Sequence, residues 1–141
     1  MTELIKRVQA VEAMASEWSG VRFAWGKKDC ARLAAAHIKA MGHKVSLVKF
    51  GTYGSELGAF KALKRGGFDS LEDLVDGRFV RIAPAYVRVG DLVGLQSGDD
   101  RWPALSIALG HGRVLGFLDG RAGVLAALQI KTAWSVPCLK P

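Results

Sequence analysis

The stretch that decides the fold is residues 25–36, with the sequence WGKKDCARLAAA. Asp29 is a good N-cap and the alanines and leucine after it are strong helix formers, so the stretch predicts a helix that begins at Cys30. The unpaired amides of a first helical turn favour an anion, and Lys27 and Lys28 add positive charge. The thiolate of Cys30 is therefore expected to form more readily than usual, as a catalytic nucleophile requires.

The composition predicts one domain over residues 1–141. Half of the 141 residues are hydrophobic, and a chain of this length buries roughly 68% of its unfolded surface without needing staples. Cys30 and Cys138 are too few for a disulfide scaffold and lack the paired spacing of a zinc site. Both are expected to be reduced thiols, and neither a metal nor a cofactor is predicted.

The net charge and the N-terminal sequence limit which partners and which location are expected. No apolar run approaches the roughly 18 residues of a membrane span, and the start of the chain lacks the basic and apolar segments of a signal peptide. We therefore expect synthesis in a bacterial host cytoplasm. The net charge is +7, but the basic residues are scattered singly and in pairs. That scatter favours a solvated surface, or a face that docks an acidic protein, over specific nucleic-acid binding.

The first half of the chain is predicted to be helical. Thr2 can cap a helix that ends near Ser19-Gly20, and a second helix runs from Cys30 to about Met41. Two further helices have serine caps, from Ser55 to about Arg65 and from Ser70 to about Val75. In the first helix the apolar side chains at helical spacing are Leu4, Val8, Val11, Ala15 and Trp18, whereas Lys6, Arg7 and Glu12 fall elsewhere.

The second half changes to short apolar runs separated by glycine and aspartate, which is typical of an antiparallel sheet. Turns are predicted at Gly110-His111-Gly112 and Asp119-Gly120-Arg121. Helices followed by strands indicate an α+β fold, with the cysteine helix packed on the sheet. The predicted strands are Leu92 to Gln96, Ala104 to Leu109, Arg113 to Leu118, Val124 to Leu128 and Ala133 to Val136.

The order of these motifs resembles that of the NlpC-type cysteine peptidases, a papain-like superfamily that cleaves peptides of the bacterial cell wall. A cysteine opens a helix, and Gly90-Asp91-Leu92-Val93 later leads into a strand. The chain resembles still more closely a small family of NlpC-like domains encoded in phage and prophage tail gene clusters. The stretches that match this family are Phe23 to Cys30, Tyr53 to Ala59 with its serine shifted by one place, Gly90-Asp91, and Ala133-Trp134-Ser135-Val136.

The resemblance implies a nucleophile at Cys30 and a histidine base that opens the second strand of the sheet. Here Ala104 stands at that position, and residues 114–117 offer no polar side chain to orient a base. An alanine cannot accept a proton from a thiol, so the catalytic triad does not transfer to this chain.

The three histidines are the remaining candidates for a base. His37 lies seven residues after Cys30 and therefore roughly 10 Å along the helix, which suits a core histidine. His43 follows the helix and is expected in a surface loop. His111 lies in a predicted turn, roughly 23 Å along the strand from Ala104, and would act as a base only in a different register.

Cys30 itself has a structural alternative, because cysteine is often buried as a small hydrophobe. On the predicted strand the small side chains of Ala104, Ser106 and Ala108 share one face, and we expect that face to pack against the cysteine helix.

Two further groups are weaker candidates. The loop Gly98-Asp99-Asp100 could bind a cation, but adjacent carboxylates without spaced ligands are usually a solvated turn. Trp25, Trp102 and Trp134 could form a ligand platform, although core packing or a partner interface suits them better.

The resemblance and the missing histidine together lead to two hypotheses. The first is a structural component of a phage tail tip or baseplate, built on an NlpC-like fold that has lost peptidase activity. Its partners would be other tail-tip or hub proteins, and its location the virion. The second is an active peptidase or amidase that opens peptidoglycan during DNA entry, with a base from His111 or from a neighbouring subunit.

Overall fold

The computed structural model describes residues 2–96, 104–127 and 129–141. The helices within these ranges are α1 (Glu3–Trp18), α2 (Cys30–Ala40), α3 (Glu56–Arg65) and α4 (Leu71–Asp76), with short 3₁₀ turns η1 (Val48–Phe50) and η2 (Pro84–Tyr86). The strands are β1 (Val80–Arg81), β2 (Leu92–Leu95), β3 (Ala104–Gly110), β4 (Arg113–Leu118), β5 (Arg121–Ala126) and β6 (Ile130–Ser135). The predicted α+β class is confirmed.

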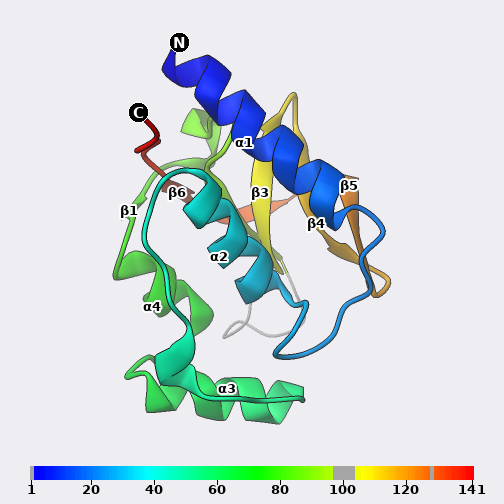
Figure 1. Ribbon diagram of the computed structural model, residues 1–141, viewed down its shortest axis with the longest axis vertical. Helices are drawn as coiled ribbons and strands as arrows, with labels where there is room; N and C mark the ends of the chain where they lie inside the picture. Colours follow the sequence, from blue (N-terminus) through cyan, green and yellow to red (C-terminus); the bar gives the residue numbers. More distant parts are fainter. Residues whose placement is uncertain (1, 97–103, 128) are drawn as a thin grey trace.

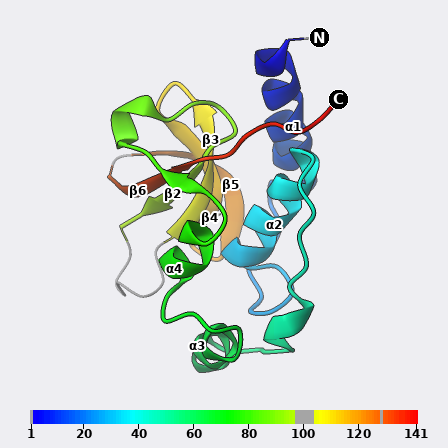
Figure 2. The same ribbon diagram turned by 90° about the vertical axis from the view of Figure 1, so that its left-hand side faces the viewer.

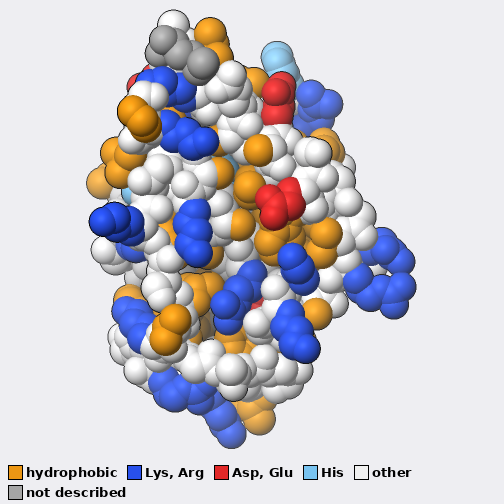
Figure 3. Space-filling model, in the orientation of Figure 1, with side chains coloured by type: hydrophobic (Ala, Val, Ile, Leu, Met, Phe, Trp, Pro, Cys, Tyr) orange, Lys and Arg blue, Asp and Glu red, His pale blue; other side chains and the backbone are white. Residues whose placement is uncertain are grey.

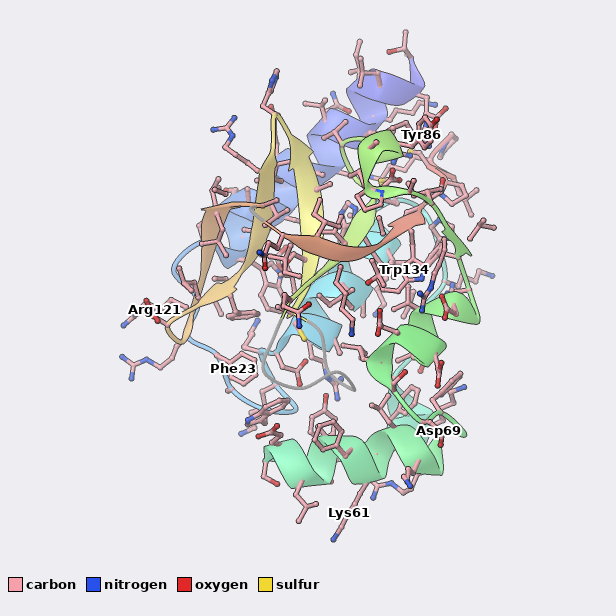
Figure 4. The ribbon with its side chains drawn as sticks, turned by 180° about the vertical axis from the view of Figure 1, so that it is seen from behind. Phe23, Lys61, Asp69, Tyr86, Arg121 and Trp134 are labelled. Carbon is pink, nitrogen blue, oxygen red and sulfur yellow. The ribbon has the colours of Figure 1, made fainter. Side chains whose placement is uncertain are left out.

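The strands form one antiparallel sheet in the order β1-β6-β2-β3-β4-β5. Helices α1 and α2 lie side by side across one face of this sheet, and α3 and α4 lie beyond its lower end (Figure 1). The side view shows the same two layers, with α1 and α2 to one side of the strands (Figure 2). Seen from behind, the described residues place no α-helix across the opposite face of the sheet, and the 3₁₀ helix η2 lies near β6 (Figure 4).

The four predicted helices are confirmed. They could be predicted because the residues that start each helix are adjacent to it in the sequence. The side chains of Thr2, Asp29, Ser55 and Ser70 each accept a hydrogen bond from a backbone N–H of the helix that follows. Both predicted hairpin turns are also present. His111 and Gly112, and likewise Asp119 and Gly120, have the positive φ angles that a tight two-residue hairpin turn needs.

The strands differ from the predictions mainly at their ends. The strand β5 begins at Arg121 instead of Val124, because the Asp119-Gly120 turn leads into pairing with β4 at once. Its predicted end at Leu128 lies outside the described residues. The strand β6 covers Ile130–Ser135, earlier than predicted. The two-residue strand β1 is too short for its pattern to be recognised in the sequence.

The buried face of α1 also differs from the prediction. Leu4 is 62% exposed, whereas Arg7, placed outside the apolar stripe by its sequence spacing, is 2% exposed. The residues that α1 turns inward are Arg7, Ala10, Val11, Met14 and Trp18. The helix takes this orientation because the guanidinium of Arg7 has a buried partner.

That partner is Asp91, which is fully buried at the start of β2. Arg7 Nη2 lies 2.7 Å from Asp91 Oδ1, while Nε and Nη1 of Arg7 donate to the carbonyl oxygens of Val89 and Val136, both at 2.7 Å. Asp91 also accepts from the backbone N–H groups of Val136 and Arg88, at 2.9 and 2.8 Å. One ion pair therefore ties α1 to the entrance of β2 and to the segment after β6.

None of the helices in the described part of the chain is long and apolar enough to cross a membrane.

Replacing Arg7 with methionine should lower the free energy of unfolding by about 3–5 kcal/mol, because it leaves the Asp91 carboxylate buried without its counter-ion. The measurement is urea unfolding followed by circular dichroism. Arg88→Met is the matched control, since the Arg88 side chain is 52% exposed and should cost less than about 0.5 kcal/mol. Equal small losses in both variants would contradict the role of the ion pair.

Candidate active site around Cys30

The loop before α2 is held by the side chain of Asp29, which is fully buried. Its Oδ1 accepts from the backbone N–H of Arg32 at 2.9 Å and so caps the helix. Its Oδ2 accepts from the N–H of Gly26 at 2.9 Å and from the hydroxyl of Tyr53 at 2.7 Å. Asp29 thus fixes the chain on both sides of Cys30 and connects it to the entrance of α3.

Gly26 and Tyr53 meet at close range. Gly26 has φ +78°, and a Cβ at this position would overlap the carbonyl oxygen of Tyr53. Burial raises the pKa of Tyr53, and its hydrogen bond to Asp29 raises it further. The hydroxyl of Tyr53 is therefore a proton donor to Asp29 and not a base. Sequence reasoning placed Gly26 and Tyr53 in separate motifs and missed this contact, for which the sequence carries no local signal.

Aromatic side chains pack around the same loop. Phe23 lies edge-on to Trp25, with ring centroids 4.9 Å apart, and edge-on to Phe117 of β4, at 5.1 Å. The ammonium of Lys28 lies 4.7 Å from the ring centroid of Trp18. Trp25 is thus part of an aromatic cluster that holds the loop against the sheet. The ammonium of Lys28 makes a cation–π contact with the indole ring of Trp18.

Cys30 is the first residue of α2, as predicted, but its side chain is buried. The residue is 6% exposed and belongs to the same apolar cluster as Leu33 of α2 and Leu105 of β3. Neither Cys30 nor Cys138 forms a disulfide. The thiol of Cys30 therefore lies among core side chains.

The face of β3 that meets α2 is the opposite of the one predicted. Leu105 and Ile107 belong to the apolar cluster that contains Cys30, whereas Ala108 belongs to a second cluster on the other face of the sheet. Because side chains alternate along a strand, Ala104 and Ser106 share that other face. The large side chains of β3 face α2 because α2 presents small side chains at this interface, including several alanines. The position of β3 that faces the cysteine helix at this end is therefore Leu105, which cannot act as a base either.

His37 is fully buried beside the Arg7–Asp91 ion pair. Its Nε2 lies 2.7 Å from the carbonyl oxygen of Gly90, so Nε2 carries the proton of the neutral ring. Among the described residues, its Nδ1 has no hydrogen-bond partner. His37 is the core histidine that its spacing from Cys30 predicts, and it links α2 to the Gly90-Asp91 motif.

The other two histidines also lie away from Cys30 along the chain. His43 Nε2 donates to the carbonyl oxygen of Pro137 at 2.6 Å, and its ring lies edge-on to Phe79. His111 is exposed in the β3–β4 turn. That turn lies at the upper end of the sheet in Figure 1, whereas α2 begins near the lower end. The turn that carries His111 and the start of α2 thus lie at opposite ends of the structure.

The weaker candidates are placed as follows. Trp134 is fully buried in β6, where its indole N–H donates to Asp76 Oδ1 at 2.8 Å, so it is a core residue (Figure 4). Trp102 and the Gly98-Asp99-Asp100 loop lie outside the described residues. Within the described ranges, no group of three or more His, Cys, Asp or Glu side chains could hold a metal ion.

The fold of the chain resembles that of an NlpC/p60 domain. The structure is similar to the crystal structure of the NlpC/p60 domain of the peptidoglycan hydrolase SagA, with a TM-score of 0.58. The match covers 91% of this chain and 97% of the SagA domain at 17% sequence identity. At this identity the likeness shows the fold.

The family is shown by a sequence model. Residues 4–136 match DUF6950, a domain of unknown function, and the chain belongs to this family. No curated protein matches the chain.

Gly26→Ala should lower the free energy of unfolding by about 3 kcal/mol, because alanine at positive φ is strained and its Cβ overlaps the Tyr53 carbonyl. Gly20→Ala is the matched control. Gly20 has φ +82° but no atom within 4 Å of an added Cβ, so only the backbone strain of about 1 kcal/mol remains. Chemical denaturation of both variants measures the difference, and equal losses would show that the close approach contributes nothing.

His37 should make the fold sensitive to mild acid. Burial lowers its pKa from 6.5 to about 4, and the charge of Arg7 acts in the same direction. The unfolded chain therefore binds a proton more readily, so the stability present above pH 6.5 falls as the pH drops towards 4, by up to about 3 kcal/mol. Urea unfolding at several pH values measures this fall. His37→Gln, whose amide can still donate to Gly90, should lose much of the fall, and an unchanged slope in this variant would contradict the assignment.

Proposed function

We propose that this protein is an NlpC/p60-like domain that has kept the fold of a peptidoglycan hydrolase and lost the chemistry, and that it serves as a structural part of a phage tail tip or baseplate. The observation that carries the first half of the proposal is the burial of Cys30 in the apolar core. A buried thiol on the inner face of α2 supports the helix–sheet interface.

The positions of the three histidines also support the proposed loss of catalysis. In a cysteine peptidase, a base must accept the thiol proton within hydrogen-bond reach. His37 and His43 are bound to backbone carbonyl oxygens, and His111 lies in a distant turn. No imidazole of this chain is therefore placed to activate Cys30.

The tail location rests on the sequence motifs. The Phe23 to Cys30 stretch, the Tyr53 to Ala59 stretch and the Gly90-Asp91 pair resemble those of NlpC-like domains encoded in tail gene clusters. In this structure they serve to hold the fold together: Asp29 joins the first stretch to Tyr53, and Asp91 pairs with Arg7. A stable scaffold with a net charge of +7 suits a subunit that docks acidic neighbours.

The alternative is an active peptidoglycan peptidase, and one observation favours it. Cys30 stands at the first position of a helix longer than one turn, where helix amides stabilise a thiolate. This alternative needs a base from another subunit and a movement that exposes the thiol.

Digestion of purified peptidoglycan separates the two functions. We expect the wild-type protein and Cys30→Ala to release the same background amount of soluble fragments, with the SagA domain as the positive control. Release by the wild type that Cys30→Ala abolishes would establish the peptidase and overturn the proposal.

The tail assignment has its own test. Tail-tip proteins encoded beside this chain should co-purify with it, and a specific contact should bury at least about 1,000 Å². The same protein should be found by mass spectrometry in purified phage particles. Its absence from particles and from all such complexes would contradict the structural role while leaving the loss of catalysis unaffected.

A further inference from the structure

An apolar cavity of about 230 Å³ lies beside α2, and Cys30 is not among the residues that line it. One wall is the small-residue face of α2, with Ala31, Ala34 and Ala35. The segment that follows α2 runs along this side towards α3 and α4 (Figures 1 and 2), and its residues Val45, Ser46 and Leu47 line the cavity. The opposite walls come from Phe50, Phe68 and the inner face of α4.

The cavity exists because alanines face bulky side chains without filling the space between them. Its volume exceeds that of an apolar cavity of ~150 Å³ that can hold a benzene molecule. Leu92 and Leu105 of the sheet form its floor and are almost completely buried. A hydrocarbon chain of about eight carbons is the kind of group that such walls and such a volume accept.

The mouth of the cavity is positively charged. The exposed lining residues are Ser46, Lys49, Gly77 and Arg78. Among the described residues that line the cavity, Lys49 and Arg78 are the only charged ones. Lys and Arg side chains are also much more abundant than Asp and Glu on the face shown in Figure 3.

Both cations are held against the aromatic walls. Lys49 Nζ lies 5.1 Å from the ring centroid of Phe68 and 5.3 Å from that of Phe50. The guanidinium of Arg78 lies 5.8 Å from the ring centroid of Phe79, and its Nη2 donates to the carbonyl oxygen of Lys44 at 2.8 Å. Neither makes an ion pair with a carboxylate of the described residues.

We propose that this cavity binds an amphiphile with one apolar chain and one anionic head group, such as a fatty acid or the acyl end of an anionic lipid. The chain lies among the alanines of α2 and the phenylalanines, and the head group lies at the mouth between Lys49 and Arg78. Cys30 does not line the site, and the proposal does not depend on the function proposed above.

Titration of the folded protein with octanoate, followed by NMR chemical shifts, tests the site. We expect saturable binding with a Kd on the order of 0.1–1 mM, centred on residues that line the cavity. Octan-1-ol has the same chain without the charge and should bind at least about fivefold more weakly. Acetate has the charge without the chain and should not saturate.

Two variants separate the head-group site from the chain site. Lys49→Glu combined with Arg78→Glu should weaken octanoate at least about tenfold and remove its advantage over octan-1-ol. Lys61→Glu combined with Lys64→Glu makes the same change of charge on α3 and should leave binding unchanged; Lys61 points away from the molecule in Figure 4. Ala35→Trp should fill the cavity and abolish binding of both octanoate and octan-1-ol.

Three results would overturn the proposal. They are equal binding of octanoate and octan-1-ol by the wild type, equal weakening by the two charge-reversal pairs, and no saturable binding of octanoate at all. The last result together with co-purified tail proteins that protect the cavity would assign it to a partner's apolar side chain. Vesicles that contain an anionic lipid then distinguish a free fatty acid from a membrane lipid as the ligand. If the ligand is a lipid, the protein binds these vesicles, and Lys49→Glu combined with Arg78→Glu reduces that binding.

Discussion

The buried ion pair between Arg7 and Asp91 is the contact on which the arrangement of this molecule depends. Taking two charges out of water is costly, and only a full set of hydrogen bonds makes the burial tolerable. Here that set comes from two segments, residues 88–89 before β2 and Val136 after β6. Any shift of α1 along the sheet would leave a charge unpaired, so this contact sets the register of the helix layer on the strands.

The second constraint is the side chain of Asp29, which fixes the start of α2. It caps the helix, holds Gly26 and accepts the Tyr53 hydroxyl, so it uses its whole carboxylate for structure. The helix is thereby set with Cys30 facing the sheet, among Leu33 and Leu105. The N-cap that places Cys30 at the start of α2 thus also belongs to the contacts that set this helix against the sheet.

The sequence predicted what is local and missed what depends on distant partners. The helices that start at Cys30, Glu56 and Leu71 each have a capping side chain one residue earlier. The Asp119-Gly120 turn follows from the backbone preference of these two residues. The burial of Arg7 could not be predicted, since its partner lies 84 residues away. The inward face of β3 was predicted wrongly because the alternating pattern of the strand gives one face of large side chains and one of small side chains. Only the alanines of α2, which lie elsewhere in the sequence, decide that the face with Leu105 packs inward.

Labelling of Cys30 by a thiol reagent, in a Cys138→Ser variant and across pH 6–9, tests the central claim most directly. The account predicts that at pH 7 the folded protein reacts at least about 100-fold more slowly than the urea-unfolded chain, because labelling must wait for the core to open. Rapid labelling of the folded protein well below pH 8.5, faster than that of the unfolded chain, would reveal an exposed and activated thiolate. That result would contradict the proposed loss of catalysis.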